Sequence, residues 1–232
     1  MMEGSIKERA FDMEPLKIKK SDDEFHVEGF PDAAKVIRLD GHKAKRLADL
    51  ALHRSDLAFA MACLEGINQI PAEQPVLREG LWRSAIVHLM KCYGRSDSRF
   101  SLDVKRVLNS DLDGKEVFKF FHNLRDKHLV HDSNAYAQCL PGAILNKEGM
   151  DHKIAKIICM SFHSQTLDQS AFGNLHLLIT RSMEWVVQEF DALCENLTRE
   201  LESVPYQDLV KRDSVTYSPP KPEEIDKRRV CS

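Results

Sequence analysis

Residues 117–131 read VFKFFHNLRDKHLVH and form most of the helix on which the predicted fold is built. Apolar residues in this stretch recur at steps of four and three, and the same steps then lead to two histidines. Such steps place residues on one face of an α-helix. In order, this face carries Val117, Phe121, Leu124, His128 and His131. We therefore predict a helix over residues 113–131 that packs through an apolar stripe ending in two imidazoles.

Apolar residues also recur at helical spacing on both sides of this helix. Further helices are expected at residues 41–70, 74–93, 102–108 and 168–204. Asp40 is a good N-cap for the first of them, Pro71 ends it, and Gly94 follows the second. The predicted fold class is mainly α, an antiparallel helical bundle.

Two segments alternate apolar and polar residues with the period of a β-strand and suggest small β-hairpins. Near the N-terminus, residues 16–19 and 25–28 are separated by a polar turn. Later in the chain, we expect strands at 143–145 and 154–162, joined by a turn at 147–149. One or two small β-hairpins should therefore accompany the helices.

These patterns divide the chain into three regions. Residues 1–39 are expected to be an N-terminal extension with a hairpin, and residues 40–204 a helical domain with a hairpin insertion near 143–162. Residues 205–232 contain Pro219-Pro220-Lys221-Pro222 and a charged end, a composition that buries little apolar surface. We predict that this last region is a flexible tail.

Composition excludes several classes of protein. The formal net charge of the 232 residues is −3, so the chain lacks the general basic charge of a protein that coats nucleic acid. No apolar stretch is long enough to span a membrane, and the charged N-terminal residues do not resemble a secretory signal. We therefore expect a cytoplasmic protein that does not bind membranes.

Motifs for common cofactors are missing from the sequence. The six cysteines are too far apart for a C-x-x-C zinc or redox site. The chain also lacks a P-loop and a dinucleotide-binding glycine motif. We expect no cofactor and no bound metal.

The helix 113–131 carries the only combination of residues that points to a particular chemistry. Arg125 lies about 60° around an ideal helix from His128 and about 120° from His131, and a looser last turn would bring His131 closer. A guanidinium can grip a phosphate, and an imidazole can move protons near neutral pH. Because the 2′-hydroxyl of RNA is an internal nucleophile, these groups are sufficient to cleave RNA without a metal.

Other interpretations of these residues stay open. A histidine on an apolar helix face is more often a packed core residue than a catalyst, and Arg125 could simply pair with Asp126 or Asp132. A metal site with His122 as third ligand is disfavoured, because His122 lies about 180° around the helix from His131. A non-catalytic module that binds a nucleotide or a partner protein, or that dimerises through the histidine stripe, is the main alternative.

Residues 121–132, FHNLRDKHLVHD, resemble the signature of the HEPN superfamily, particularly of bacterial HEPN-like proteins of the abortive-infection type. In that signature an arginine is followed directly by a polar residue and, a few positions later, by a histidine near the end of a helix. The resemblance implies a HEPN-like bundle in which Arg125 and His131 are the catalytic pair and Asp126 supports them. His128 would then contact the substrate.

The resemblance also implies an activity and partners. HEPN proteins include metal-independent endoribonucleases of toxin–antitoxin and phage-defence systems, with a site assembled across a two-fold dimer. The expected partners are therefore a second copy of the chain, an RNA substrate, and an antitoxin or nucleotidyltransferase. An excess of Lys and Arg over Asp and Glu in residues 76–131 favours binding of a polyanion near this site.

Overall fold

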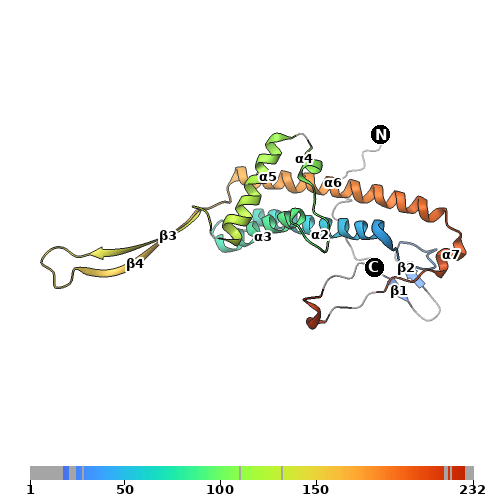
Figure 1. The fold of residues 1–232 in the computed structure, drawn as a ribbon, viewed down its shortest axis with the longest axis horizontal. Coiled ribbons are helices and arrows are strands. Elements are labelled where there is room, and N and C mark those ends of the chain that lie inside the picture. The colour runs from blue at the N-terminus through green and yellow to red at the C-terminus, as the bar shows by residue number, and fades with distance from the viewer. Residues whose placement is uncertain are drawn as a thin grey trace. The chain divides into compact units, whose positions relative to one another are not determined.

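The computed structural model describes residues 18–20, 25–27, 29–109, 111–131, 133–216, 219 and 221–227. The fold is mainly α with two small antiparallel hairpins, which confirms the predicted class at that level (Figure 1). The helices are α2 (Gly41–Gln69), α3 (Pro75–Tyr93), α4 (Val104–Leu108), α5 (Leu112–Leu124), the π-helical turn η1 (Arg125–Val130), α6 (Gln169–Glu202), α7 (Tyr206–Lys211) and the 3₁₀ turn η2 (Pro222–Glu224). The strands are β1 (Ile18–Lys20), β2 (Phe25–Val27), β3 (Ala137–Leu145) and β4 (Ile154–His163). Within the described ranges, none of the helices combines the length and the apolar character that crossing a bilayer requires.

The described residues belong to two compact units. The first unit contains the chain up to residue 58, the loop 95–101, and the chain from residue 183 onward. The second contains residues 59–94 and 102–182. The long helices α2 and α6 each contribute one segment to each unit. The helical domain expected for residues 40–204 stays a prediction.

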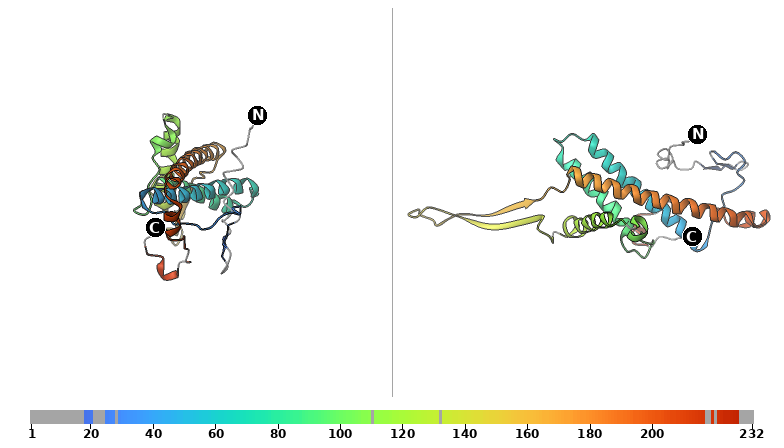
Figure 2. Two further views of the ribbon diagram at one scale, coloured as in Figure 1. Left: turned by 90° about the vertical axis from the view of Figure 1, so that its right-hand side faces the viewer. Right: turned by 90° about the horizontal axis from the view of Figure 1, so that it is seen from above.

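In the first unit, the N-terminal half of α2 pairs with the C-terminal half of α6. Nζ of Lys43 donates a hydrogen bond of 2.7 Å to Oδ1 of Asn196, and Arg46 forms an ion pair of 2.8 Å with Glu189. Residue numbers rise along α2 as they fall along α6, so the two segments are antiparallel, and Figure 2 shows them side by side. Leu50, Leu57 and Val186 are fully buried in this unit.

The segment predicted to be a flexible tail contains regular structure in the described residues. It starts with α7, and the backbone N–H of Arg38 then donates a 2.7 Å hydrogen bond to the carbonyl of Asp213. Ile37 and Ser214 form an antiparallel bridge, and Nζ of Lys35 donates a 2.7 Å hydrogen bond to the carbonyl of Val210. Composition does not reveal this regular structure, because backbone pairing with residues 36–38 holds the segment without requiring a large apolar surface.

The second unit is built around a buried tryptophan of α3. The Trp82 ring meets the Phe121 ring edge-on, with centroids 5.9 Å apart, and its Nε1 donates a 2.9 Å hydrogen bond to Oγ1 of Thr166. Both rings are fully buried, as are Leu175 and Ile179 of α6. Helices α3, α5 and α6 thus share one apolar core, as their helical periodicity predicts.

Both hairpins form, with boundaries that differ from the predicted ones. In the first, Ile18 pairs with Val27, while residues 1–17, 21–24 and 28 lie outside the described part of the chain. In the second, β3 starts at Ala137, six residues earlier than expected, and Pro141 and Gly142 are part of the ladder. Proline and glycine usually mark a turn, but a two-stranded ribbon has free edges on which proline is tolerated.

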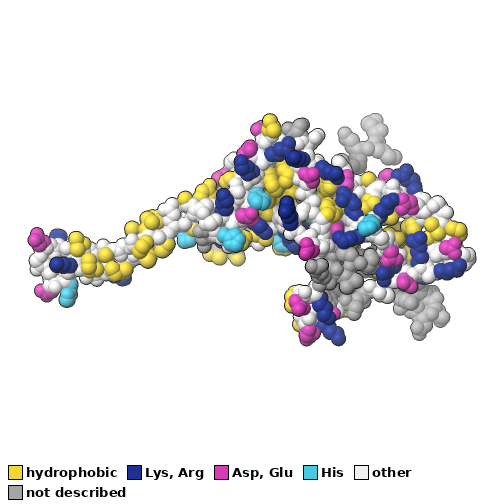
Figure 3. All heavy atoms as spheres, in the orientation of Figure 1, with side chains coloured by type: hydrophobic (Ala, Val, Ile, Leu, Met, Phe, Trp, Pro, Cys, Tyr) yellow, Lys and Arg dark blue, Asp and Glu magenta, His cyan; other side chains and the backbone are white. Residues whose placement is uncertain are grey.

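The β3–β4 ribbon exposes apolar side chains on both faces. Leu140 and Ile144 of β3 and Ile157, Met160 and Phe162 of β4 are all exposed. Figure 3 shows hydrophobic side chains along this ribbon and charged side chains at its tip. An isolated two-stranded hairpin of this kind is only marginally stable in water.

Candidate functional site

The N-terminal end of α5 is fixed by an aspartate. Oδ1 of Asp111 accepts a 2.9 Å hydrogen bond from the backbone N–H of Gly114, and the same carboxylate forms an ion pair with Arg181 of α6. These contacts hold the pKa of Asp111 below its ordinary value, the Gly114 hydrogen bond contributing most. A Cβ at Gly114 would lie 2.9 Å from Oδ2 of Asp111, so glycine permits this close approach.

Aromatic contacts fix the rest of α5. The ring of Phe118 meets the ring of Tyr93 with centroids 4.7 Å apart, and the Tyr93 hydroxyl lies 2.7 Å from the Ser182 hydroxyl. One turn later Phe121 packs on Trp82, and Leu124 is buried after it. The end of α5 is therefore held firmly by its apolar face.

The helix does not continue regularly to His131 as predicted. It changes after Leu124 to π-helical winding over Arg125–Val130, in which hydrogen bonds join residues five apart. The carbonyl of Lys127 accepts a 2.8 Å hydrogen bond from the backbone N–H of Ser133, and His131 leaves the helix with φ −135° and ψ 71°. The last turn is thus wider than an α-turn, and single π-turns of this kind are frequent at functional sites.

Of the four predicted site residues, Arg125 and Asp126 form an ion pair, and His131 acts electrostatically on the same carboxylate. The guanidinium of Arg125 donates a hydrogen bond to Oδ1 of Asp126, and both side chains are half-buried. His131 is exposed and lies near enough to favour the charged form of this carboxylate. The Arg125 hydrogen bond is the main reason that the pKa of Asp126 lies below its ordinary value, with further contributions from the charges of His122, Arg125 and His131.

A second imidazole belongs to this cluster and was not predicted as part of the site. Nε2 of His122 lies 3.6 Å from Oδ2 of Asp126, one helical turn further along. The sequence contains this signal, since residues four apart lie on one helix face. It was missed because His122 was compared only with His131 as a metal ligand. We call His122, Arg125, Asp126 and His131 the Asp126 cluster.

The fourth predicted residue, His128, lies elsewhere. Its side chain is 6 % exposed and its ring meets the ring of Tyr136 edge-on, with centroids 5.7 Å apart. Its Nδ1 has no hydrogen-bond partner among the described residues. His128 is therefore a buried residue packed on Tyr136, and the predicted contact with substrate would require a rearrangement.

The Asp126 cluster combines groups suited to acid–base chemistry on an anion. Only some of the five guanidinium N–H groups of Arg125 are needed by Asp126, so others can bind phosphate oxygens. Imidazole is the side chain that most often transfers protons in catalysis, and the lowered pKa of Asp126 favours its ionised form. Within the described ranges, no group of three or more His, Cys, Asp and Glu side chains is arranged to hold a metal ion.

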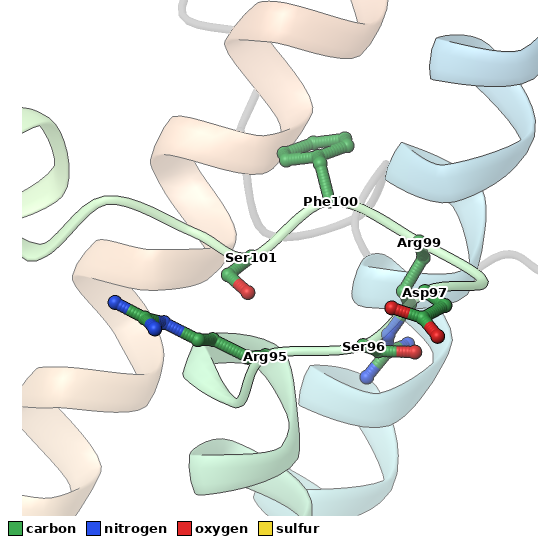
Figure 4. Close-up of a pocket in the computed structure, with 6 residues that line it drawn as sticks. All are labelled: Arg95, Ser96, Asp97, Arg99, Phe100 and Ser101. Atoms are coloured by element: carbon green, nitrogen blue, oxygen red, sulfur yellow. The ribbon is translucent and has the colours of Figure 1, made fainter.

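A hollow lies in the first unit, around the loop 95–101. Figure 4 shows its lining, which consists of Arg95, Ser96, Asp97, Arg99, Phe100 and Ser101. Arg99 forms a buried ion pair of 2.6 Å with Asp56 of α2, and Nε2 of His53 donates a 2.8 Å hydrogen bond to the carbonyl of Phe100. Residues of α2 thus bind both the Arg99 side chain and the Phe100 backbone of this loop. We therefore assign the hollow a structural role.

No protein-family model, no curated protein and no solved structure matches this chain.

Proposed function

We propose that the chain is a metal-independent endoribonuclease of HEPN type, with the Asp126 cluster as its active site. The observation that carries this proposal is the position of the Asp126 carboxylate. It binds the Arg125 guanidinium, lies 3.6 Å from Nε2 of His122, and is close enough to His131 for its pKa to respond. A cation and two proton-transfer groups thus surround one anchor at the exposed end of α5.

The proposed reaction is an attack of the RNA 2′-oxygen on the adjacent phosphorus. Arg125 binds the phosphate through the donors that Asp126 does not use and stabilises the charge of the transition state. His131 transfers a proton, which is typically worth about 10²–10⁴-fold in rate. In this exchange the 2′-hydroxyl gives up its proton as the 2′-oxygen bonds to phosphorus, the bond from phosphorus to the 5′-oxygen breaks, and the 5′-oxygen leaves with a proton, so that a 2′,3′-cyclic phosphate remains. Asp126 orients Arg125 and the imidazoles and does not itself exchange protons.

The proposal includes a two-fold homodimer that would bring two clusters together. Exposed apolar side chains flank the cluster, namely Phe120 on α5 and Val130 on η1. A second copy that covers them would also exclude water from the site. In a toxin–antitoxin or phage-defence system, an antitoxin or nucleotidyltransferase partner would control this activity.

A non-catalytic nucleotide- or protein-binding module is the second candidate. It is favoured by the Arg125–Asp126 ion pair, which already neutralises part of the positive charge at the site. Such a module would bind a nucleotide or a partner without cutting RNA. Binding without cleavage, lost in Arg125→Ala, would support this candidate.

Cleavage of mixed RNA by the purified protein in the presence of a chelator tests the proposal. We expect fragments with cyclic-phosphate ends, and a loss of about 10²-fold or more in His131→Ala. His176→Ala is the matched control, because His176 is an exposed helical histidine outside the cluster. Equal cleavage by His131→Ala and wild type, with both folded, would contradict the assignment.

A further inference from the structure

The β3–β4 ribbon holds two exposed cysteines on one of its faces. Cys139 pairs with Ser161 across the ladder, and Pro141 pairs with Cys159. Residues that are directly opposite or two positions apart in a strand point to the same face. Cys139 and Cys159 are therefore diagonal neighbours, although 20 positions separate them in the chain.

One of the two thiols accepts a hydrogen bond from a nearby hydroxyl, and each thiol lies within the electrostatic influence of the other. Oγ of Ser161 donates a 3.7 Å hydrogen bond to Sγ of Cys139. A hydrogen bond with Cys139 raises the pKa of Cys159 above its ordinary value. The raised pKa favours the protonated form of the Cys159 thiol, so we expect Cys139 to react first.

We infer that Cys139 and Cys159 form a reversible cross-strand disulfide when the protein meets a low-molecular-weight disulfide such as oxidised glutathione. The geometry favours this pair, since both thiols are exposed, share one face and are diagonal neighbours in the ladder. The modification is independent of the function proposed for the Asp126 cluster.

Closure of the disulfide requires only a small adjustment of the ribbon. Diagonal neighbours in a ladder lie about 7–8 Å apart on average, and a disulfide needs Cα atoms within about 7 Å. Two-stranded ribbons twist more than strands inside a sheet, because no further strand restrains them. Among the described residues β3 and β4 form a two-stranded ladder, so it can twist to bring the two backbones together.

The exchange proceeds in two balanced steps. The Cys139 thiolate attacks one sulfur of oxidised glutathione and expels a glutathione thiolate, which leaves a mixed disulfide on Cys139. Cys159 then loses its proton to solvent, attacks Sγ of Cys139 and expels the second glutathione thiolate. Two electrons pass from the protein thiols to the glutathione disulfide, which is reduced to two thiols.

The test uses the full chain, reduced, desalted and incubated in mixtures of oxidised and reduced glutathione. Free thiols are blocked with N-ethylmaleimide, and digested peptides are identified by mass spectrometry. We expect a linked Cys139–Cys159 peptide, loss of maleimide labelling at both cysteines, and recovery of labelling after dithiothreitol. In Cys194→Ser, which leaves the pair intact, the same linkage should form.

Two further variants keep the result interpretable. Cys159→Ser should retain glutathione on Cys139, because the second step is blocked, whereas Cys139→Ser should take up several-fold less glutathione at Cys159. Maleimide labelling of both cysteines that persists in oxidised glutathione would overturn the inference. A disulfide between two chains as the main product would overturn it as well.

Discussion

Nε2 of His122 lies 3.6 Å from Oδ2 of Asp126, which also binds Arg125 through its other oxygen. The His122 side chain is 51 % exposed and the Asp126 side chain 34 %. Ion pairs at such exposure contribute about 0–1 kcal/mol to folding. The His122–Asp126 pair therefore adds little to the stability of the fold. We propose that it instead positions the charged groups of the cluster.

We predict that Asp126→Asn lowers RNA cleavage at least about tenfold while the fold is preserved. The amide keeps the size of the side chain but loses the charge that orients Arg125 and the imidazoles. Because the lost ion pairs are exposed, the melting temperature should change by only a few degrees. Cleavage rates and thermal melts of the same preparation measure both effects, and a large drop in melting temperature at normal activity would refute the assigned role.

Arg125→Lys should be almost as inactive as Arg125→Ala. Lysine retains the charge but lacks the planar set of donors that can bind Asp126 and a phosphate together. We therefore expect a loss of about 10²-fold or more in cleavage for both variants. Wild-type activity in the lysine variant would mean that only the charge is needed. Lys119→Arg is the matched control, since Lys119 is an exposed lysine of α5, the helix that leads into η1.

The sequence predicts most helix positions because helical spacing of apolar residues is a strong signal. The predicted ranges 41–70 and 74–93 agree with α2 and α3 to within a residue or two. The change to π-winding after Leu124 could not be predicted, because residue spacing fits an α-helix equally well there. The extra length of β3 was missed because Pro141 and Gly142 suggest a turn.

For the site, the assignment of catalytic roles to Arg125, Asp126 and His131 stays a prediction. The sequence placed His128 and His131 on one stripe but could not show which of them is exposed. In the structure His128 is buried while His131 is exposed, and His131 stands where the chain leaves the π-helical turn. Burial depends on packing against α3 and on Tyr136, neither of which helical spacing alone reveals.

Alanine substitutions of two adjacent phenylalanines should differ in how much they destabilise the fold, because one side chain is buried in the core and the other is partly exposed. Phe121 is fully buried against Trp82, so Phe121→Ala should lower the free energy of unfolding by about 3–5 kcal/mol. Phe120 is 41 % exposed, so Phe120→Ala should cost less than about half as much. Chemical denaturation of both variants measures the difference, and equal destabilisation would contradict the packing described here.

Stability should decrease between about pH 6.5 and 4 because of His53. This side chain is fully buried, and burial together with the charge of Arg99 lowers the pKa of His53 to about 4, although Asp49 and Asp56 act in the opposite direction. The folded chain thus binds fewer protons than the unfolded chain in this range, so stability falls as pH falls. A shift of this size corresponds to about 3 kcal/mol.

Denaturation of wild type and His53→Gln across this pH range checks the prediction. Glutamine can still donate a hydrogen bond to the Phe100 carbonyl but does not titrate, so the variant should lose most of the slope above pH 4. Carboxylates with lowered pKa values, such as Asp111 and Asp126, act only at lower pH. If the slope of stability against pH were unchanged in His53→Gln, the effect would belong to other groups. The control variant His176→Gln should behave as wild type.

The most direct test of the ribonuclease proposal compares one oligonucleotide made as RNA and with a single 2′-deoxyribose at the cleaved position. Both are incubated with wild-type protein and with Arg125→Ala in a chelator. We predict that wild type cuts only the all-RNA strand, leaves a 2′,3′-cyclic phosphate, and loses this activity in Arg125→Ala. Cleavage of the deoxy-substituted strand at the same position, or undiminished cleavage by Arg125→Ala, would contradict the proposal.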